Sequence, residues 1–151
     1  MKRMPFRWLC TVVVLILSVG LLSYLFPTYK QREKEYYSSR ENYTTVTGTV
    51  SNVIYANNGQ VFVYIYDKSV NFTDTGFILD GDNARIAKEN GIQTKLQTGT
   101  VVEFVCAPRY FGDGYKIPMV ALCIEGESIL DFETGFYNLN AEYGTRLPLT
   151  D

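Results

Sequence analysis

A run of 19 uncharged residues near the N-terminus, residues 8–26, constrains this chain more than any other feature. At about 1.5 Å per residue, a helix over this run reaches roughly 28 Å, close to the thickness of a bilayer's hydrocarbon core. We therefore expect a cytoplasmic tail at residues 1–7 and a single transmembrane helix at residues 8–26. A cleavable signal peptide is the alternative. The run ends without an A-x-A-like triplet, which favours a retained signal-anchor.

The orientation of that helix depends on the segments at its two ends. Basic side chains flank the run on both sides, so the charge bias alone does not decide the orientation. Short basic tails usually stay in the cytosol and long C-terminal domains are translocated, so we expect a single-pass protein of the cell membrane with its C-terminal domain outside the cytoplasm. Residues 27–43 form the predicted stalk. Its oppositely charged pairs three residues apart favour a helix, and a solvated charged linker is the other interpretation.

Beyond residue 44 the apolar residues alternate, which is the pattern of β-strands. In residues 45–51, Val46 and Val50 alternate with hydroxyl side chains, and Gly48 suggests a bulge or a bend. A turn at residues 57–59 leads to a second strand at residues 61–66. This strand places Val61, Val63 and Ile65 on one face, and its three aromatic residues on the other.

The later elements complete a recognisable order. We expect a third strand within residues 71–79, then a short helix that Asp82 caps and Gly91 ends, and then strands at residues 100–106 and 117–124. Because of this order and size, residues 44–125 resemble an OB-fold, a five-stranded Greek-key barrel with a helix between its third and fourth strands. Another small antiparallel barrel or sandwich is the alternative. The predicted fold class is therefore mainly β, with the transmembrane helix before the barrel and a C-terminal helix after it.

The C-terminal extension, residues 126–146, carries large apolar side chains at spacings of 3, 4, 3 and 4, which lie on one side of a helix. Gly135 is expected to interrupt that helix. The stripe either packs on the barrel, closing one end or covering the aromatic face of the second strand, or binds a partner. Residues 147–151 are expected to be a loose tail. The candidate partner-binding residues are Ile129, Phe132, Phe136, Leu139 and Tyr143.

The resemblance to OB-folds also implies where a ligand would bind, because such folds use the face of strands two and three and the loops flanking it. Aromatic rings and amides there would stack against a sugar or a peptide, and an arginine and an aspartate would anchor it. Packing of the same rings into the fold is the competing interpretation. The candidate ligand-binding residues are Phe62, Tyr64, Tyr66, Asn57, Asn58, Arg109, Tyr110, Phe111, Asp113 and Tyr115.

Charge and composition exclude several functions. Of 14 basic and 16 acidic side chains, residues 1–43 hold 7 and 3, which leaves 7 and 13 for residues 44–151 and a net charge of −6 there. A domain of that charge is unsuited to binding nucleic acid. With no histidine in the chain, no Ser-His-Asp arrangement is available. We expect no catalytic residues, no metal and no cofactor.

Cys106 and Cys123 lie on neighbouring predicted strands, so a disulfide requires both to share a face in compatible register. Two buried free thiols are the alternative. Taken together, the sequence predicts a membrane-anchored extracytoplasmic binding or assembly module of the cell envelope. Its partner would be a protein or an envelope glycan. The alternatives are a structural subunit of a membrane protein complex and, with less support, a small hydrolase that uses paired carboxylates.

Overall fold

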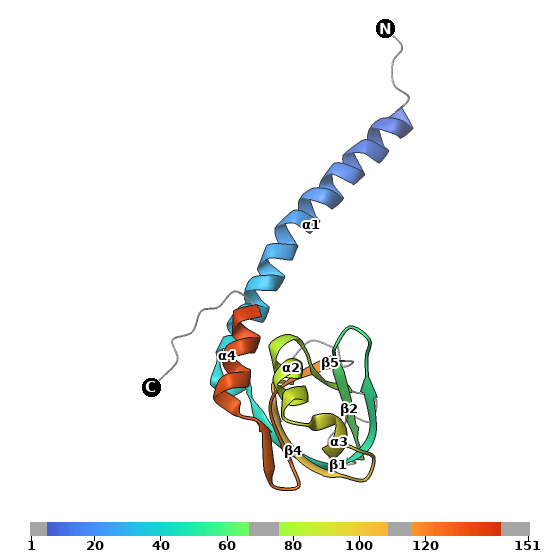
Figure 1. The fold of residues 1–151 in the computed structure, drawn as a ribbon. Helices are drawn as coiled ribbons and strands as arrows, with labels where there is room; N and C mark the ends of the chain where they lie inside the picture. Colours follow the sequence, from blue (N-terminus) through green and yellow to red (C-terminus); the bar gives the residue numbers. More distant parts are fainter. Residues whose placement is uncertain (1–5, 67–75, 109–115, 143–151) are drawn as a thin grey trace. The chain divides into compact units, whose positions relative to one another are not determined.

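Helix α1 (Phe6–Ser38) precedes the β-strands in the computed structural model, which describes residues 6–66, 76–108 and 116–142 (Figure 1). The chain divides into two compact units, Met1–Tyr36 and Tyr37–Asp151. The charged residues 30–38 continue the helix, and a short 3-10 helix, η1 (Arg40–Asn42), comes after it.

The prediction of a transmembrane helix is wrong. In the described part of the chain, no helix combines the length and the apolar character that crossing a membrane requires.

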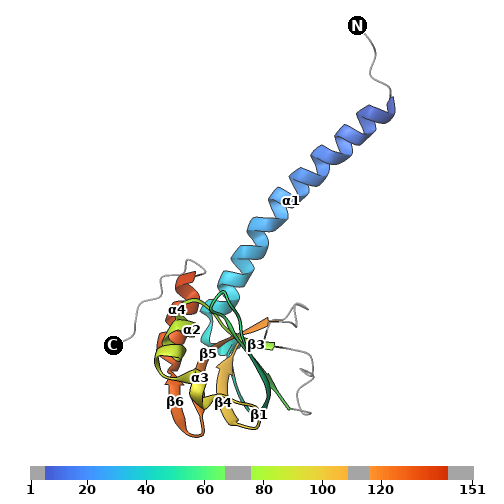
Figure 2. The same ribbon diagram turned by 45° about the vertical axis from the view of Figure 1, so that its right-hand side comes forward.

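Five strands close into a mixed barrel, as predicted and consistent with an OB-like small barrel: β1 (Thr44–Tyr55), β2 (Val61–Ile65), β3 (Gly76–Leu79), β4 (Val101–Cys106) and β5 (Lys116–Ile124). The antiparallel pairs are β1–β2, β2–β3, β1–β4 and β4–β5. The parallel pair β3–β5 closes the barrel. Figures 1 and 2 show the strands wrapping around one interior, which fixes which side chains face outward.

Buried side chains alternate with more exposed ones along the strands, and the buried ones form the core. Val61 and Val63 on β2 are fully buried, and Phe104 on β4 is 1% exposed. Helices α2 (Gly81–Glu89) and α3 (Ile92–Lys95) lie between β3 and β4. Helix α2 corresponds to the predicted helix and ends before Gly91, whose left-handed conformation (φ 80°) separates it from α3, which was not predicted. The cap of α2 is Asp80, which accepts a hydrogen bond from the Gly81 N–H, and not Asp82 as predicted.

Strand β1 is longer than predicted and pairs with two neighbouring strands. Residues 44–49 pair with β4 and residues 50–55 with β2, with an irregularity between Val50 and Asn52. At Gly48, an added Cβ would lie 3.0 Å from the Ile65 Cδ1 atom. The glycine therefore makes room for Ile65 where β1 passes from one neighbour to the other, and the irregular pairing lies a few residues beyond it.

The C-terminal extension is not one helix. Glu125 (φ 50°) and Gly126 (φ 87°) form a two-residue turn of the kind that joins hairpin strands, and the chain returns as β6 (Glu127–Leu130) beside β5. Ile129 therefore lies on a strand, and α4 (Phe132–Glu142) begins after it. Gly135 does not interrupt α4. It lets the helix approach β5, because a Cβ at this position would collide with the Val120 carbonyl group.

Candidate functional site

The aromatic residues of β2 lie on the opposite side of the strand from the buried valines, as the alternation predicts. Phe62 and Tyr64 alternate with buried valines and are half-exposed, and Tyr66, just beyond the strand, is 67% exposed. Helix α4 packs against β5 and α2. Among the described residues, the rings of β2 are therefore at least partly accessible to solvent.

The strand register aligns a row of residues across four strands. Ile54 on β1 lies opposite Phe62, which lies opposite Ile78 on β3, which in turn pairs with Pro118 on β5. Ile78 is only 7% exposed, so the accessible part of the row lies on β1 and β2 on one side of it and at Pro118 on the other. Neighbouring strands are about 4.8 Å apart, so the row is about 14 Å wide. We call Ile54, Phe62, Tyr64, Tyr66 and Pro118 the aromatic face.

Two polar residues border the aromatic face. Asn52 lies opposite Tyr64 and is exposed. The Lys116 Nζ atom lies 5.5 Å from the centroid of the Phe62 ring, a cation–π contact worth about 0.5–1 kcal/mol at an exposed site. The sequence prediction missed Asn52, Ile54 and Lys116. Val53, Ile54 and Tyr55, all good strand formers, could have signalled the longer β1.

The β1–β2 turn is held by contacts within the turn and by contacts with Asp80, before α2, and Lys88, in α2. The Asn58 Nδ2 group donates to Gln60 Oε1 (2.8 Å), and Gln60 Nε2 donates to the Asp80 carboxylate (2.6 Å). Lys88 Nζ donates to the carbonyl of Gly59 (2.6 Å), whose φ of 97° the turn requires. Of the two predicted asparagines, Asn58 is thus used within the turn, whereas Asn57 is exposed. The other predicted ligand-binding residues, Arg109, Tyr110, Phe111, Asp113 and Tyr115, lie outside the described residues.

The apolar residues predicted to bind a partner are covered by the chain itself. Phe136 is 3% and Leu139 is 8% exposed, while Ile129 is buried on β6 and Tyr143 lies outside the described residues. The Tyr43 ring meets the Phe132 and Phe136 rings edge-on, with centroids 5.8 and 5.3 Å away. We call Phe132, Phe136 and Leu139 the α4 stripe.

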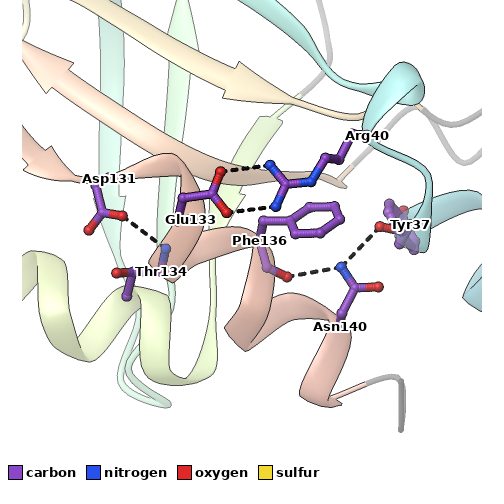
Figure 3. Close-up of polar contacts among 7 residues, drawn as sticks. All are labelled: Tyr37, Arg40, Asp131, Glu133, Thr134, Phe136 and Asn140. Atoms are coloured by element: carbon purple, nitrogen blue, oxygen red, sulfur yellow. Dashed lines mark hydrogen bonds and ion pairs between the residues drawn. The ribbon is translucent and has the colours of Figure 1, made fainter. Parts of the chain in front are cut away.

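Polar contacts fasten residues 37–43 over the α4 stripe (Figure 3). Arg40 donates two hydrogen bonds of 2.6 Å to the Glu133 carboxylate, and its guanidinium carbon lies 4.8 Å from the Phe136 ring centroid. The carbonyl of Tyr37 accepts from the Tyr43 hydroxyl (2.8 Å) and from the fully buried Asn140 amide (3.0 Å). Hydrogen bonding to Arg40 lowers the pKa of Glu133. The stripe is therefore part of the folded domain.

The two strand cysteines are free thiols. Cys106 lies opposite Met119, whereas Cys123 lies opposite Glu103, so the register that a disulfide requires is not met. Burial raises the pKa of Cys106 to about 12, which makes its thiol unreactive at neutral pH.

No family model, no curated protein and no solved structure matches this chain.

Proposed function

We propose that the barrel domain is an OB-fold binding or assembly module without a catalytic role, and that the aromatic face is its binding surface. The observation that carries this proposal is the half-exposed row of Ile54, Phe62 and Tyr64 on adjacent strands. Contiguous exposed apolar surface of this kind is typical of interaction sites, and aromatic side chains dominate the energetics of such interfaces.

The net charge of the barrel domain limits the classes of ligand that can bind the aromatic face. Residues 44–151 carry a net charge of −6, so a polyanion would be repelled. A neutral envelope glycan stacked on the rings, with the exposed Asn52 amide donating to its hydroxyl groups, fits this surface. A neutral or basic protein surface fits it as well.

Site-specific photo-cross-linking tests the proposal. A photoreactive phenylalanine analogue is placed at Tyr66 in the full chain and, as a matched control, at Tyr137, which is 36% exposed on α4. We expect a cross-linked adduct from position 66 and a much weaker one from position 137. Phe62→Ala should abolish the adduct at position 66. Equal labelling from both positions would contradict the proposal.

We also place the module at a cell membrane with the barrel on the extracytoplasmic side. In support, α1 exposes large apolar side chains from Val12 to Tyr24, and exposed apolar area of this extent favours an apolar environment. A reporter enzyme that is active only outside the cytoplasm, fused after Asp151, tests the location. Activity is expected, and an inactive but intact fusion would contradict it.

A further inference from the structure

A groove lies on the outer wall of the barrel between β4, β5 and β6, apart from the aromatic face. Its volume is about 270 Å³. Its floor contains Val105, which lies opposite Ala121 on β5, and the next outward-facing residue on β5 is Cys123. The outward side chains of Val105, Ala121 and Cys123 are small, whereas the Phe132 side chain at the start of α4 is large. The small side chains therefore form a depression beside the Phe132 ring.

The charged side chains that line the groove are all acidic. Glu103 lies opposite Cys123 and is exposed, and Asp131 lies where β6 leads into α4. Among the residues that the structure describes, no lysine or arginine lines the groove. Arg40, which lies 5.4 Å from the Phe132 ring centroid, is already bound by the Glu133 carboxylate. The described lining of the groove therefore combines an apolar floor with acidic side chains at its rim.

We propose that this groove binds a lysine or arginine side chain presented by an extended segment of a partner protein. The aliphatic stem would lie along Val105, Ala121 and Cys123, and the cationic head would meet Glu103. Long basic side chains bury their stems in this way while keeping the charge at a polar rim. A volume of about 270 Å³ is at the lower limit of small-molecule pockets, which suits one side chain.

Glu103 is the main electrostatic contact. Asp131 accepts a hydrogen bond from the Thr134 N–H at the first turn of α4. The partial positive charge at the N-terminus of that helix therefore already offsets part of the negative charge of Asp131. The net charge of −6 on residues 44–151 adds a long-range attraction for a basic partner. This inference does not depend on the aromatic face.

The test is a titration of the ¹⁵N-labelled full chain, in a non-ionic detergent, with capped pentapeptides. The three probes are Gly-Gly-Lys-Gly-Gly and its counterparts with norleucine or glutamate at the centre. We expect the lysine peptide to shift the amide signals of Ala121 and Cys123, the norleucine peptide to bind more weakly, and the glutamate peptide not to bind. Equal binding of lysine and norleucine peptides, or shifts at Phe62 and Tyr64 instead, would overturn the proposal.

Variants separate a specific contact from general charge. Glu103→Gln should weaken the lysine peptide by up to about fivefold, the range for an exposed ion pair. Glu125→Gln makes the same charge change on the β5–β6 turn, outside the groove, and should have no such effect. Ala121→Phe should fill the groove and abolish binding, whereas Val101→Phe, exposed on β4 outside it, should not. Equal losses in Glu103→Gln and Glu125→Gln would refute the assigned site even if Ala121→Phe failed to fold.

Discussion

The aromatic face and the α4 stripe differ in what covers them. Residues 37–43 lie over the α4 stripe, fastened by the Arg40–Glu133 pair and by two hydrogen bonds to the carbonyl of Tyr37. On the aromatic face, Tyr66 is 67% and Ile54 is 44% exposed. A row of apolar side chains thus becomes core where a neighbouring segment packs over it and is fastened by polar contacts. Among the described residues, no segment is fastened over the aromatic face in this way.

The largest effect expected from this comparison is a contrast between two phenylalanines. Phe136→Ala removes a ring that is 3% exposed and should cost about 3–5 kcal/mol of folding free energy. Phe62→Ala should cost less, about 1–2 kcal/mol, because its ring is only partly buried. Urea unfolding of the full chain, followed by near-ultraviolet circular dichroism, measures both. Similar losses would show that the aromatic face is also core.

The next effect concerns the close approach of α4 to β5. Gly135→Ala should destabilise the barrel domain by about 1–3 kcal/mol, although alanine favours helices over glycine by about 1 kcal/mol, because the new Cβ meets the Val120 carbonyl group. Gly20→Ala in α1 is the matched control, since nothing lies within 4 Å of its added Cβ. A Gly135→Ala variant that melts at a higher temperature would contradict this packing.

The barrel was predictable from sequence because alternation of apolar residues is a local signal. The same signal separated Val61 and Val63 from Phe62, Tyr64 and Tyr66 onto opposite faces of the second strand, and left open which rings would be covered. It missed β6, since the apolar spacing from Ile129 onward also fits a helix. Only Gly126, which provides a positive φ in the hairpin turn, marks the break.

The cover over the α4 stripe could not be predicted in the same way. Arg40 and Glu133 are 93 positions apart, and Tyr37 and Asn140 are 103 apart. No periodic pattern connects positions so distant in the sequence. Such long-range contacts decide whether an aromatic row is surface or core. From the sequence alone, the rings of the second strand and the apolar residues of the C-terminal extension were therefore equally candidates for binding.

A smaller effect is expected at the start of α4, where Asp131 orients the stripe. Its carboxylate accepts from the Thr134 N–H (2.9 Å), which lowers its pKa. Asp131→Ala should cost about 0.5–2 kcal/mol at neutral pH. Because the folded pKa lies below the unfolded value of about 3.9, the ionic contribution is present above that value and is lost as pH falls through the folded pKa. Asp131→Asn keeps a capping oxygen, so its thermal stability should lack this acid-dependent loss, and an unchanged loss would argue against the cap.

The smallest effect is expected at the other end of α4, and its sign is opposite. Burial, and then the charges of Asp80 and Asp82, raise the pKa of Glu142, which also stands at the negative end of the helix. With the folded pKa above the unfolded value of about 4.3, the wild type loses stability as pH rises from that value through the folded pKa. Glu142→Gln should therefore stabilise the domain at pH 7 by up to about 0.5 kcal/mol, with no difference below pH 4. Thermal melts of both proteins at the two pH values measure this, and a neutral-pH loss in Glu142→Gln would mean that Glu142 makes a favourable contact with the start of α2.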